Sequence, residues 1–291
     1  MDTSAHQLLS AMIANNASDL YLTANTPPSF RIGNKIMHHG EKNLAPADIE
    51  RMMREIVSDE IIEEFNSTLE HNTAISWQNS ARFRVNLFRQ RQCVGMVLRR
   101  IHTEIPSLES LHLPAIYGKL IMKKRGLILI VGPTGSGKST SMASMLEYRN
   151  LYGDGHIVTI EDPIEFVLEH KNCIITQRDV GIDTHSFGIG LKNALRQSPD
   201  VIVIGEIRDK ETMEHAIVFS ETGHLCMATL HANNANQAIE RIINFFPQEK
   251  HPQLLLNLSL NLRAILSQRR LPNTMSGHSV AIEILLNEGL I

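Results

Sequence analysis

The segment from Gly132 to Thr140 reads GPTGSGKST and directly follows an apolar run. Its glycines allow backbone N–H groups to turn inward around phosphate oxygens, and a helix beginning there presents its positive end to the same anion. In this pattern Lys138 is expected to reach the β- and γ-phosphates, and Ser139 to ligate Mg²⁺. The sequence therefore predicts a P-loop that binds ATP and Mg²⁺ through Gly132, Pro133, Thr134, Gly135, Ser136, Gly137, Lys138, Ser139 and Thr140.

Acidic residues follow two further apolar runs. Glu206 ends the stretch DVIVIGE, where it is expected to hold the metal shell and polarise an attacking water. The second cluster reads EDPIE and includes Pro163, which fixes the backbone and can aim the flanking carboxylates, and Glu165. Two acidic strand ends beside one Mg·ATP suit metal-assisted hydrolysis. Taken by itself, without the other motifs, the second cluster would be interpreted as a charged turn.

Two histidines, His224 and His231, enclose another apolar run. A strand between them would hold them too far apart to bind one metal ion, and no further ligands have zinc spacing. As hydrogen-bond donors they could sense or touch the γ-phosphate, His231 more directly.

These residues require elements that bring them together. Short apolar strands at 127–131, 156–160, 201–204 and 225–230 alternate with helical patterns, which indicates an α/β domain whose mostly parallel sheet is covered on both faces. Upstream, helical spacing and alternating strands predict a smaller α+β domain. We expect domains at 1–105 and 119–291, joined by a proline-flanked linker at 106–118.

The composition of the whole sequence limits the kinds of partner that we expect for this protein. The net charge of -3 over 291 residues gives no electrostatic support for nucleic acid as a direct partner. Three cysteines without a CxxC pair favour free thiols in a reducing cytosol. The N-terminus lacks a signal-peptide pattern, and the most apolar run is too short to cross a bilayer, so membrane association is expected only through partners.

Four segments occur in an order that resembles the secretion and type IV pilus ATPases: GPTGSGKST, IEDPIE, RQSPDVIVIGEIRD and TGHLCMATLHANNANQA. They are similar to the Walker A motif, Asp box, Walker B motif and His box of that superfamily. SDLYLTANTPPSFRIGNKI resembles its N-terminal PAS-like domain. The PilT/PilU family of pilus retraction ATPases fits best, and ATLHANNANQAIERIINFFP and GMVLRRI resemble its PilU branch. The extension ATPases carry a longer N-terminal region and a cysteine-rich zinc insertion, and this sequence has neither.

The resemblance implies a RecA-like P-loop ATPase domain behind a PAS-like domain, assembled as a homohexamer with ATP bound between domains. Glu206 would be the Walker B glutamate and also a metal-shell ligand, Glu165 the Asp-box glutamate, and His224 and His231 the His-box pair. It also implies arginine fingers, for which the candidates are Arg82, Arg84 and Arg99. An arginine stripe on a strand is otherwise usually a solvated face. Family members continue further, so Ile291 is expected to be a truncation point.

The implied function is a cytoplasmic ATPase motor that powers type IV pilus retraction, and with it twitching motility and DNA uptake. It would dock at the cytoplasmic face of the inner membrane through the pilus platform protein, as a PilU-type accessory to a PilT-like paralogous ATPase. Two alternatives stay open. One is a type II secretion or conjugation-type ATPase, and the other is a mainly non-catalytic accessory ring on a paralogous motor.

Overall fold

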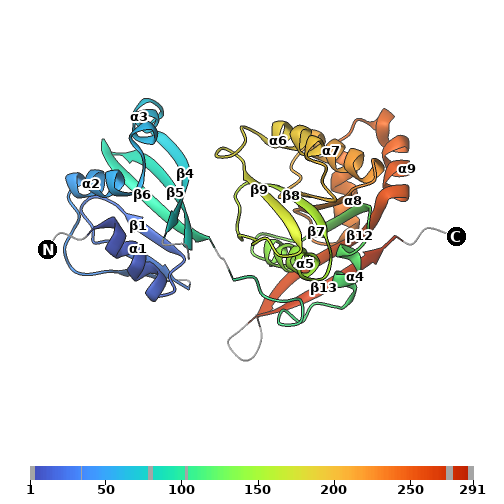
Figure 1. Cartoon of the computed structure of the whole chain (residues 1–291), viewed down its shortest axis with the longest axis horizontal. Coiled ribbons are helices and arrows are strands. Elements are labelled where there is room, and N and C mark those ends of the chain that lie inside the picture. The colour runs from blue at the N-terminus through green and yellow to red at the C-terminus, as the bar shows by residue number, and fades with distance from the viewer. Residues whose placement is uncertain (1–3, 34, 78–80, 102–103, 273–277, 288–291) are drawn as a thin grey trace. The chain divides into compact units, whose positions relative to one another are not determined.

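Figure 1 shows the computed structural model of the chain, which describes residues 4–33, 35–77, 81–101, 104–272 and 278–287. The chain divides into two compact units, Met1–Thr103 and Glu104–Ile291. The predicted linker at 106–118 lies at the start of the second unit.

The first unit is an antiparallel sheet with helices on one face. Its strand order is β3-β2-β1-β6-β5-β4, with β1 Asp19–Leu22, β2 Ser29–Ile32, β3 Lys35–His38, β4 Glu70–Trp77, β5 Ala81–Gln90 and β6 Cys93–Ile101. The helices are α1 Ala5–Ala14, α2 Pro46–Ile56 and α3 Asp59–Thr68.

The alternation along β5 explains this one-sided packing. Phe83, Val85 and Leu87 are buried in one apolar cluster with side chains from all three helices, whereas Arg82 and Arg84 project from the opposite face of the strand. Because the helices cover only the apolar face, the opposite face of the sheet carries polar side chains.

Phe83→Ala should lower the free energy of unfolding of the first unit by about 3–5 kcal/mol, because it empties a site in which the ring is 0% exposed. Trp77 is the single tryptophan of the sequence and lies in this unit, so its fluorescence follows the unit during urea unfolding. Arg84→Ala, on the polar face, is the control and should change the same free energy by less than about 0.5 kcal/mol. Equal losses in the two variants would contradict this packing.

The second unit is built on a mixed sheet with the strand order β13-β12-β7-β11-β10-β8-β9. The strands are β7 Gly126–Val131, β8 Gly155–Glu161, β9 Cys173–Asp179, β10 Val201–Ile204, β11 Leu225–Leu230, β12 Leu262–Pro272 and β13 His278–Leu286. All neighbours pair in parallel except β12 and β13, which form an antiparallel ribbon.

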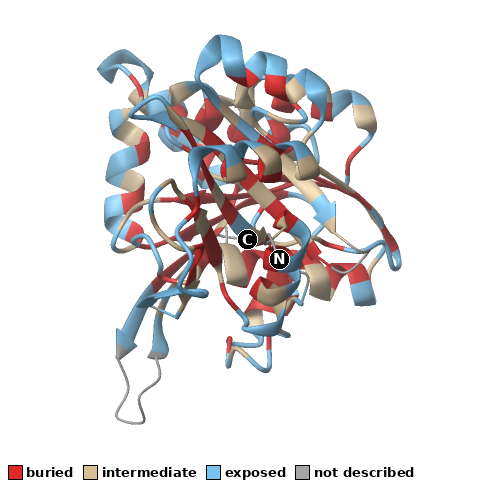
Figure 2. Cartoon of the chain, turned by 90° about the vertical axis from the view of Figure 1, so that its left-hand side faces the viewer, coloured by how far each residue is buried: buried red, intermediate tan, exposed pale blue. Residues whose placement is uncertain are grey.

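Helices cover both faces of this sheet. They are α4 Ile116–Ile121, α5 Lys138–Tyr152, α6 Phe187–Ala194, α7 Lys210–Glu221, α8 Ala235–Asn244 and α9 His251–Asn261. One core joins alternate residues of the strands to α6, α7, α8 and α9, and a second core joins the remaining strand residues to α4 and α5. Buried residues, which are red in Figure 2, therefore run along the strands of this sheet. The near-continuous apolar strands predicted this double burial.

The parallel register brings four strand ends to one edge of the sheet. Val201 of β10 lies opposite both Ile157 of β8 and Leu225 of β11, and Leu225 lies opposite Gly126 of β7. Residues that directly follow these strands therefore meet at the same edge, where ligands bind in open α/β sheets.

Polar contacts tie the start of the second unit to the helix that follows the P-loop. The Ser144 hydroxyl donates to the Pro106 carbonyl oxygen over 2.7 Å. The buried Gln268 amide of β12 donates to both the Tyr117 hydroxyl, over 3.1 Å, and the Ser141 hydroxyl, over 2.8 Å. The predicted linker is thus held against α5 rather than hanging free of it.

Among the described residues, no helix is long and apolar enough to cross a membrane. All three cysteines are free thiols, and Cys173 and Cys226 are buried.

Candidate active site

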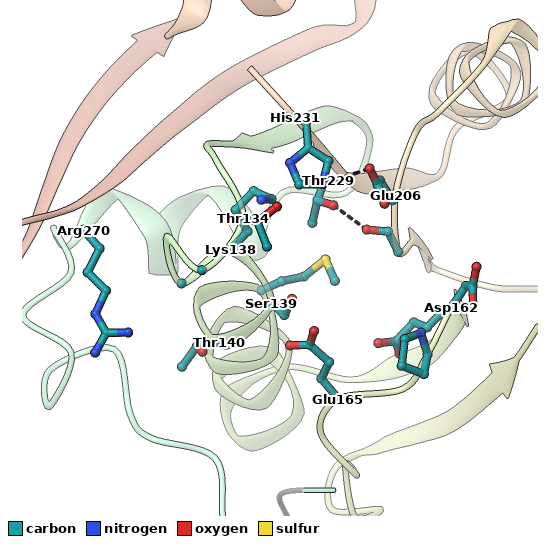
Figure 3. A pocket seen from close by; sticks show the side chains of 16 residues that line it. Thr134, Lys138, Ser139, Thr140, Asp162, Glu165, Glu206, Thr229, His231 and Arg270 are labelled. Carbon is teal, nitrogen blue, oxygen red and sulfur yellow. Dashed lines mark hydrogen bonds and ion pairs between the residues drawn. The ribbon is translucent and has the colours of Figure 1, made fainter. Parts of the chain in front are cut away.

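A cavity of about 390 Å³ lies at the carboxyl edge of the parallel strands. Figure 3 shows the side chains that line it, contributed by the P-loop and by the ends of β8, β10 and β11. Arg270 of β12 stands across the P-loop from the acidic residues, and its position could not be foreseen from the sequence motifs. The cavity brings together Lys138, Glu165, Glu206 and His231, which lie far apart in the sequence.

The P-loop is shaped by its backbone. Gly135 and Gly137 have φ angles of 76° and 92°, in the left-handed region that favours glycine, and α5 begins at the next residue, Lys138. The Lys138 ammonium donates to the carbonyl oxygens of Gly132 and Pro133, over 2.8 and 3.0 Å. Burial lowers the pKa of Lys138, and the nearby charges of Glu206 and Glu165 oppose that effect.

The Ser136 hydroxyl is buried and has no hydrogen-bond partner within the described ranges. Buried polar groups are normally paired, so an unpaired one beside a glycine loop indicates a place for an external acceptor. Together with the P-loop lysine and the start of α5, it fits a phosphate group.

Glu206 follows β10 and is held from two sides. Its Oε1 lies 3.0 Å from Nε2 of His231, which follows β11. Its Oε2 accepts from Nε of Arg208 over 2.8 Å, and Nη1 of Arg208 donates to Oδ2 of Asp162 over 3.0 Å. The hydrogen bond to Glu206 raises the pKa of Arg208. Sequence reasoning missed Arg208, although it stands in the quoted GEIRD stretch.

The end of β8 supplies three more carboxylates. Asp162 and Glu165 flank Pro163, whose peptide bond to Asp162 is cis, and both line the cavity together with Glu161. Glu161 is 8% exposed and accepts hydrogen bonds from Thr159, over 2.7 Å, and from Gln177, over 3.3 Å. Burial raises the pKa of Glu161 to about 7. Sequence reasoning passed over this residue, because the inward direction of its side chain depends on the pairing of β8.

Glu161→Gln should remove part of the pH dependence of stability. Because the pKa of Glu161 is about 7 in the folded chain and has its ordinary value of 4.5 in the unfolded chain, the folded chain keeps a proton that the unfolded chain loses as pH rises through this window. The wild-type free energy of unfolding should therefore fall by about 3 kcal/mol between pH 4.5 and 7, whereas glutamine has no such proton to lose.

Urea unfolding of the nucleotide-free chain at pH 5 and pH 8 measures this effect. Circular dichroism should follow the transition, since the single tryptophan lies in the other unit. The stability of the variant relative to the wild type should rise by about 3 kcal/mol from the lower pH to the higher. The same difference at both pH values would contradict a protonated Glu161 in the folded chain.

Of the two predicted histidines, His231 lines this cavity and His224 does not. The six residues of β11 separate the two histidines, and a strand of that length spans about 20 Å. His224 lies at the opposite edge of the sheet, where its Nδ1 is 3.0 Å from the Thr222 hydroxyl and 3.2 Å from the Phe219 carbonyl oxygen.

The three candidate finger arginines lie on the polar face of the first unit's sheet. Arg84 of β5 is directly opposite Arg99 of β6. Arg99 donates from Nε to Oδ1 of the buried Asp19 over 2.8 Å. Within the part of the chain that the structure describes, Arg82 and Arg84 have no such ion pair.

In the described ranges, no group of three or more His, Cys, Asp or Glu side chains is arranged to hold a metal ion. A Mg²⁺ ion in a nucleotide site takes only one or two protein ligands and binds phosphate and water oxygens besides. The Ser139 hydroxyl and the Glu206 carboxylate, which both line the cavity, fit that smaller set.

Comparisons with known proteins agree over nearly the whole chain. The family model described as Type II/IV secretion system protein matches residues 2–280. The chain is 52% identical to the type IV pilus ATPase PilU of Pseudomonas aeruginosa, over 98% of this chain and 75% of that protein. It is 38% identical to the pilus retraction ATPase PilT of the same organism, over 96% of this chain and 81% of that one. The crystal structure of the pilus retraction motor PilT with bound ADP matches with a TM-score of 0.93 at 40% identity, over 99% of this chain and 84% of that chain.

Proposed function

Because this chain belongs to the family of type II/IV secretion system proteins, we propose that it is a Mg²⁺-dependent ATPase that drives retraction of a type IV pilus. The family predicted from the four ordered motifs is confirmed, and so is the predicted fold class. The observation that carries the proposal is a single cavity that holds the P-loop lysine, two carboxylates from separate strand ends and His231.

The first step is nucleotide binding. Backbone N–H groups of the P-loop and the start of α5 would receive the β- and γ-phosphates, and Lys138, which lines the same cavity, would contact them with its ammonium. Thr140 and Arg270 line the part of the cavity away from Glu206 and are placed to contact the α-phosphate and nucleoside end. Ser139 and Glu206 would hold Mg²⁺, which supplies charge neutralisation at the phosphates when bound.

Hydrolysis is proposed to depend on Glu206. Its carboxylate lies at the carboxyl edge of β10, facing the cavity, where it can accept a proton from an attacking water. His231 contacts the same carboxylate, and its proposed role is to donate a hydrogen bond to the γ-phosphate. Glu165, from the end of β8, adds a second carboxylate that can orient the water. His224 is proposed to act only indirectly, through the packing of α7 against β11.

We propose that the chain assembles as a homohexamer in which another subunit supplies arginines to each site. Arg82 and Arg84 are the candidates, because Arg99 is already engaged by Asp19. Arg84→Ala should lower kcat about 100-fold, since an arginine supplied in trans stabilises the charge of the transition state. Steady-state phosphate release measures the loss.

An experiment that mixes two variants tests whether the arginine acts on the site of a neighbouring subunit. Arg84→Ala lacks the finger but keeps its P-loop, and Lys138→Ala lacks the P-loop lysine but keeps the finger. Mixed in equal amounts, the two inactive variants should recover about a quarter of wild-type activity. In a randomly mixed ring, about a quarter of the sites combine an intact P-loop lysine from one subunit with an intact arginine from its neighbour. No recovery in rings shown to contain both variants would contradict an intersubunit site.

The contacts between α5 and the linker suggest how hydrolysis becomes movement. A shift of α5 on nucleotide binding would pull on Pro106 through Ser144, and on Tyr117 through Ser141 and Gln268. We propose that each such cycle moves the first unit, and that a ring of such subunits turns or displaces the inner-membrane platform protein of the pilus from its cytoplasmic face. We further propose that the chain works beside a PilT-like paralogue.

The proposed role in pilus retraction can be tested in cells. Deleting the gene, alone and together with its PilT-like paralogue, and restoring wild-type or Glu206→Gln alleles should show retraction with the first allele and its loss or weakening with the second. Equal retraction with both alleles would favour a non-catalytic accessory ring. Normal pili combined with a defect in protein secretion or conjugation would instead favour the other open function.

A further inference from the structure

Arg208 connects two acidic strand ends from outside the cavity. Its guanidinium bridges Glu206, which follows β10, and Asp162, which follows the neighbouring strand β8. Both carboxylates line the cavity, whereas Arg208 does not. The arginine therefore contacts the proposed base without lining the cavity itself.

The backbone fixes this arrangement. Ile207, between the two residues, is fully buried, and its N–H donates to the Thr229 carbonyl oxygen over 2.9 Å. Glu206 and Arg208 flank this anchored residue, and their side chains meet in a hydrogen bond of 2.8 Å. Their bond is then reinforced by Asp162 from another strand.

The Arg208 bridge affects the orientation of the Glu206 carboxylate more than the stability of the fold. The Arg208 side chain is 52% exposed, and ion pairs with that much solvent contact add only about 0–1 kcal/mol to folding. However, both oxygens of Glu206 are engaged, Oε1 by His231 and Oε2 by Arg208. A planar guanidinium that holds two carboxylates at once fixes the rotation of each.

We propose that Arg208 is a positioning residue that orients the Glu206 carboxylate for water activation by bridging it to Asp162. This inference rests on the proposed ATPase function. A base works only when its oxygen faces the proton that it accepts, and small misplacements lower rates strongly. Without the bridge, Glu206 keeps its His231 contact and can rotate about it, so catalysis suffers while the P-loop still binds nucleotide.

The test compares purified full-length Arg208→Ala and Arg208→Lys with the wild type. Arg208→Ala should lower kcat for ATP about 10- to 100-fold, while KM and ADP affinity stay within about twofold. Arg208→Lys should recover only part of the rate, because one ammonium cannot reproduce the Nε and Nη1 pair. Lys210→Ala is the matched control, since it breaks a nearby exposed ion pair with Glu214 that does not line the cavity, and its kcat should stay unchanged.

Three outcomes would overturn the inference. The first is a kcat for Arg208→Ala equal to that of Lys210→Ala. The second is a tenfold loss of ADP affinity with kcat retained, which would place Arg208 on the nucleotide. The third is an increase in kcat, which would make the bridge inhibitory. Absence of hydrolysis by the wild type would instead overturn the proposed ATPase function, and this inference with it.

Discussion

Lys138→Ala should weaken ATP binding by at least about 100-fold. Lys138 is 8% exposed, and its ammonium is held by two carbonyl oxygens of the P-loop, beside the proposed phosphate position. Charge-assisted hydrogen bonds to phosphate are among the strongest polar contacts, and alanine removes the charge and every donor. Loss of about 3 kcal/mol of binding free energy corresponds to that factor. Titration with a fluorescent ATP analogue measures it.

Lys171→Ala is the control for this substitution. Lys171 pairs with Glu147 away from the cavity, so the variant should bind nucleotide like the wild type. If Lys138→Ala bound the analogue within about threefold of the control, the P-loop lysine would not be the main phosphate ligand.

Glu206→Gln should lower kcat by about 10²- to 10⁴-fold while ATP still binds. Glutamine preserves the size of the side chain, but it cannot take a proton from water at neutral pH. The P-loop and Lys138 are unchanged, so the nucleotide affinity is expected to survive within about threefold. Steady-state phosphate release and analogue binding, measured on one preparation, separate the two quantities. Glu165→Gln is the comparison and should lose less activity. A larger loss with Glu165→Gln would reverse the proposed roles.

Much of the α/β architecture could be predicted because local pattern and tertiary burial agree there. The apolar runs at 127–131, 201–204 and 225–230 lie within β7, β10 and β11, since strands buried on both faces need no polar alternation. The apolar stretch VAIEILL, which begins at Val280, lies within β13, and residues 288–291 lie outside the described part of the chain. Parallel pairing then places the residues after each strand at one edge.

The rest of the site depends on side-chain directions that spacing does not encode. Arg208 follows Glu206 by only two residues, but its bond to Asp162 needs the adjacency of β8 and β10. Arg270 reaches the cavity only because β12 pairs with β7, a contact between segments far apart in sequence. His224 was grouped with His231 by motif, and the length of β11 separates them.

The central claim is that this one cavity hydrolyses ATP. Its most direct measurement is the release of inorganic phosphate from ATP by the purified chain in the presence of Mg²⁺, compared with Glu206→Gln. The wild type should release phosphate, the release should stop when the metal is chelated, and the variant should bind ATP but release about 100-fold less. Equal phosphate release by wild type and variant, with ATP bound to both, would contradict the account.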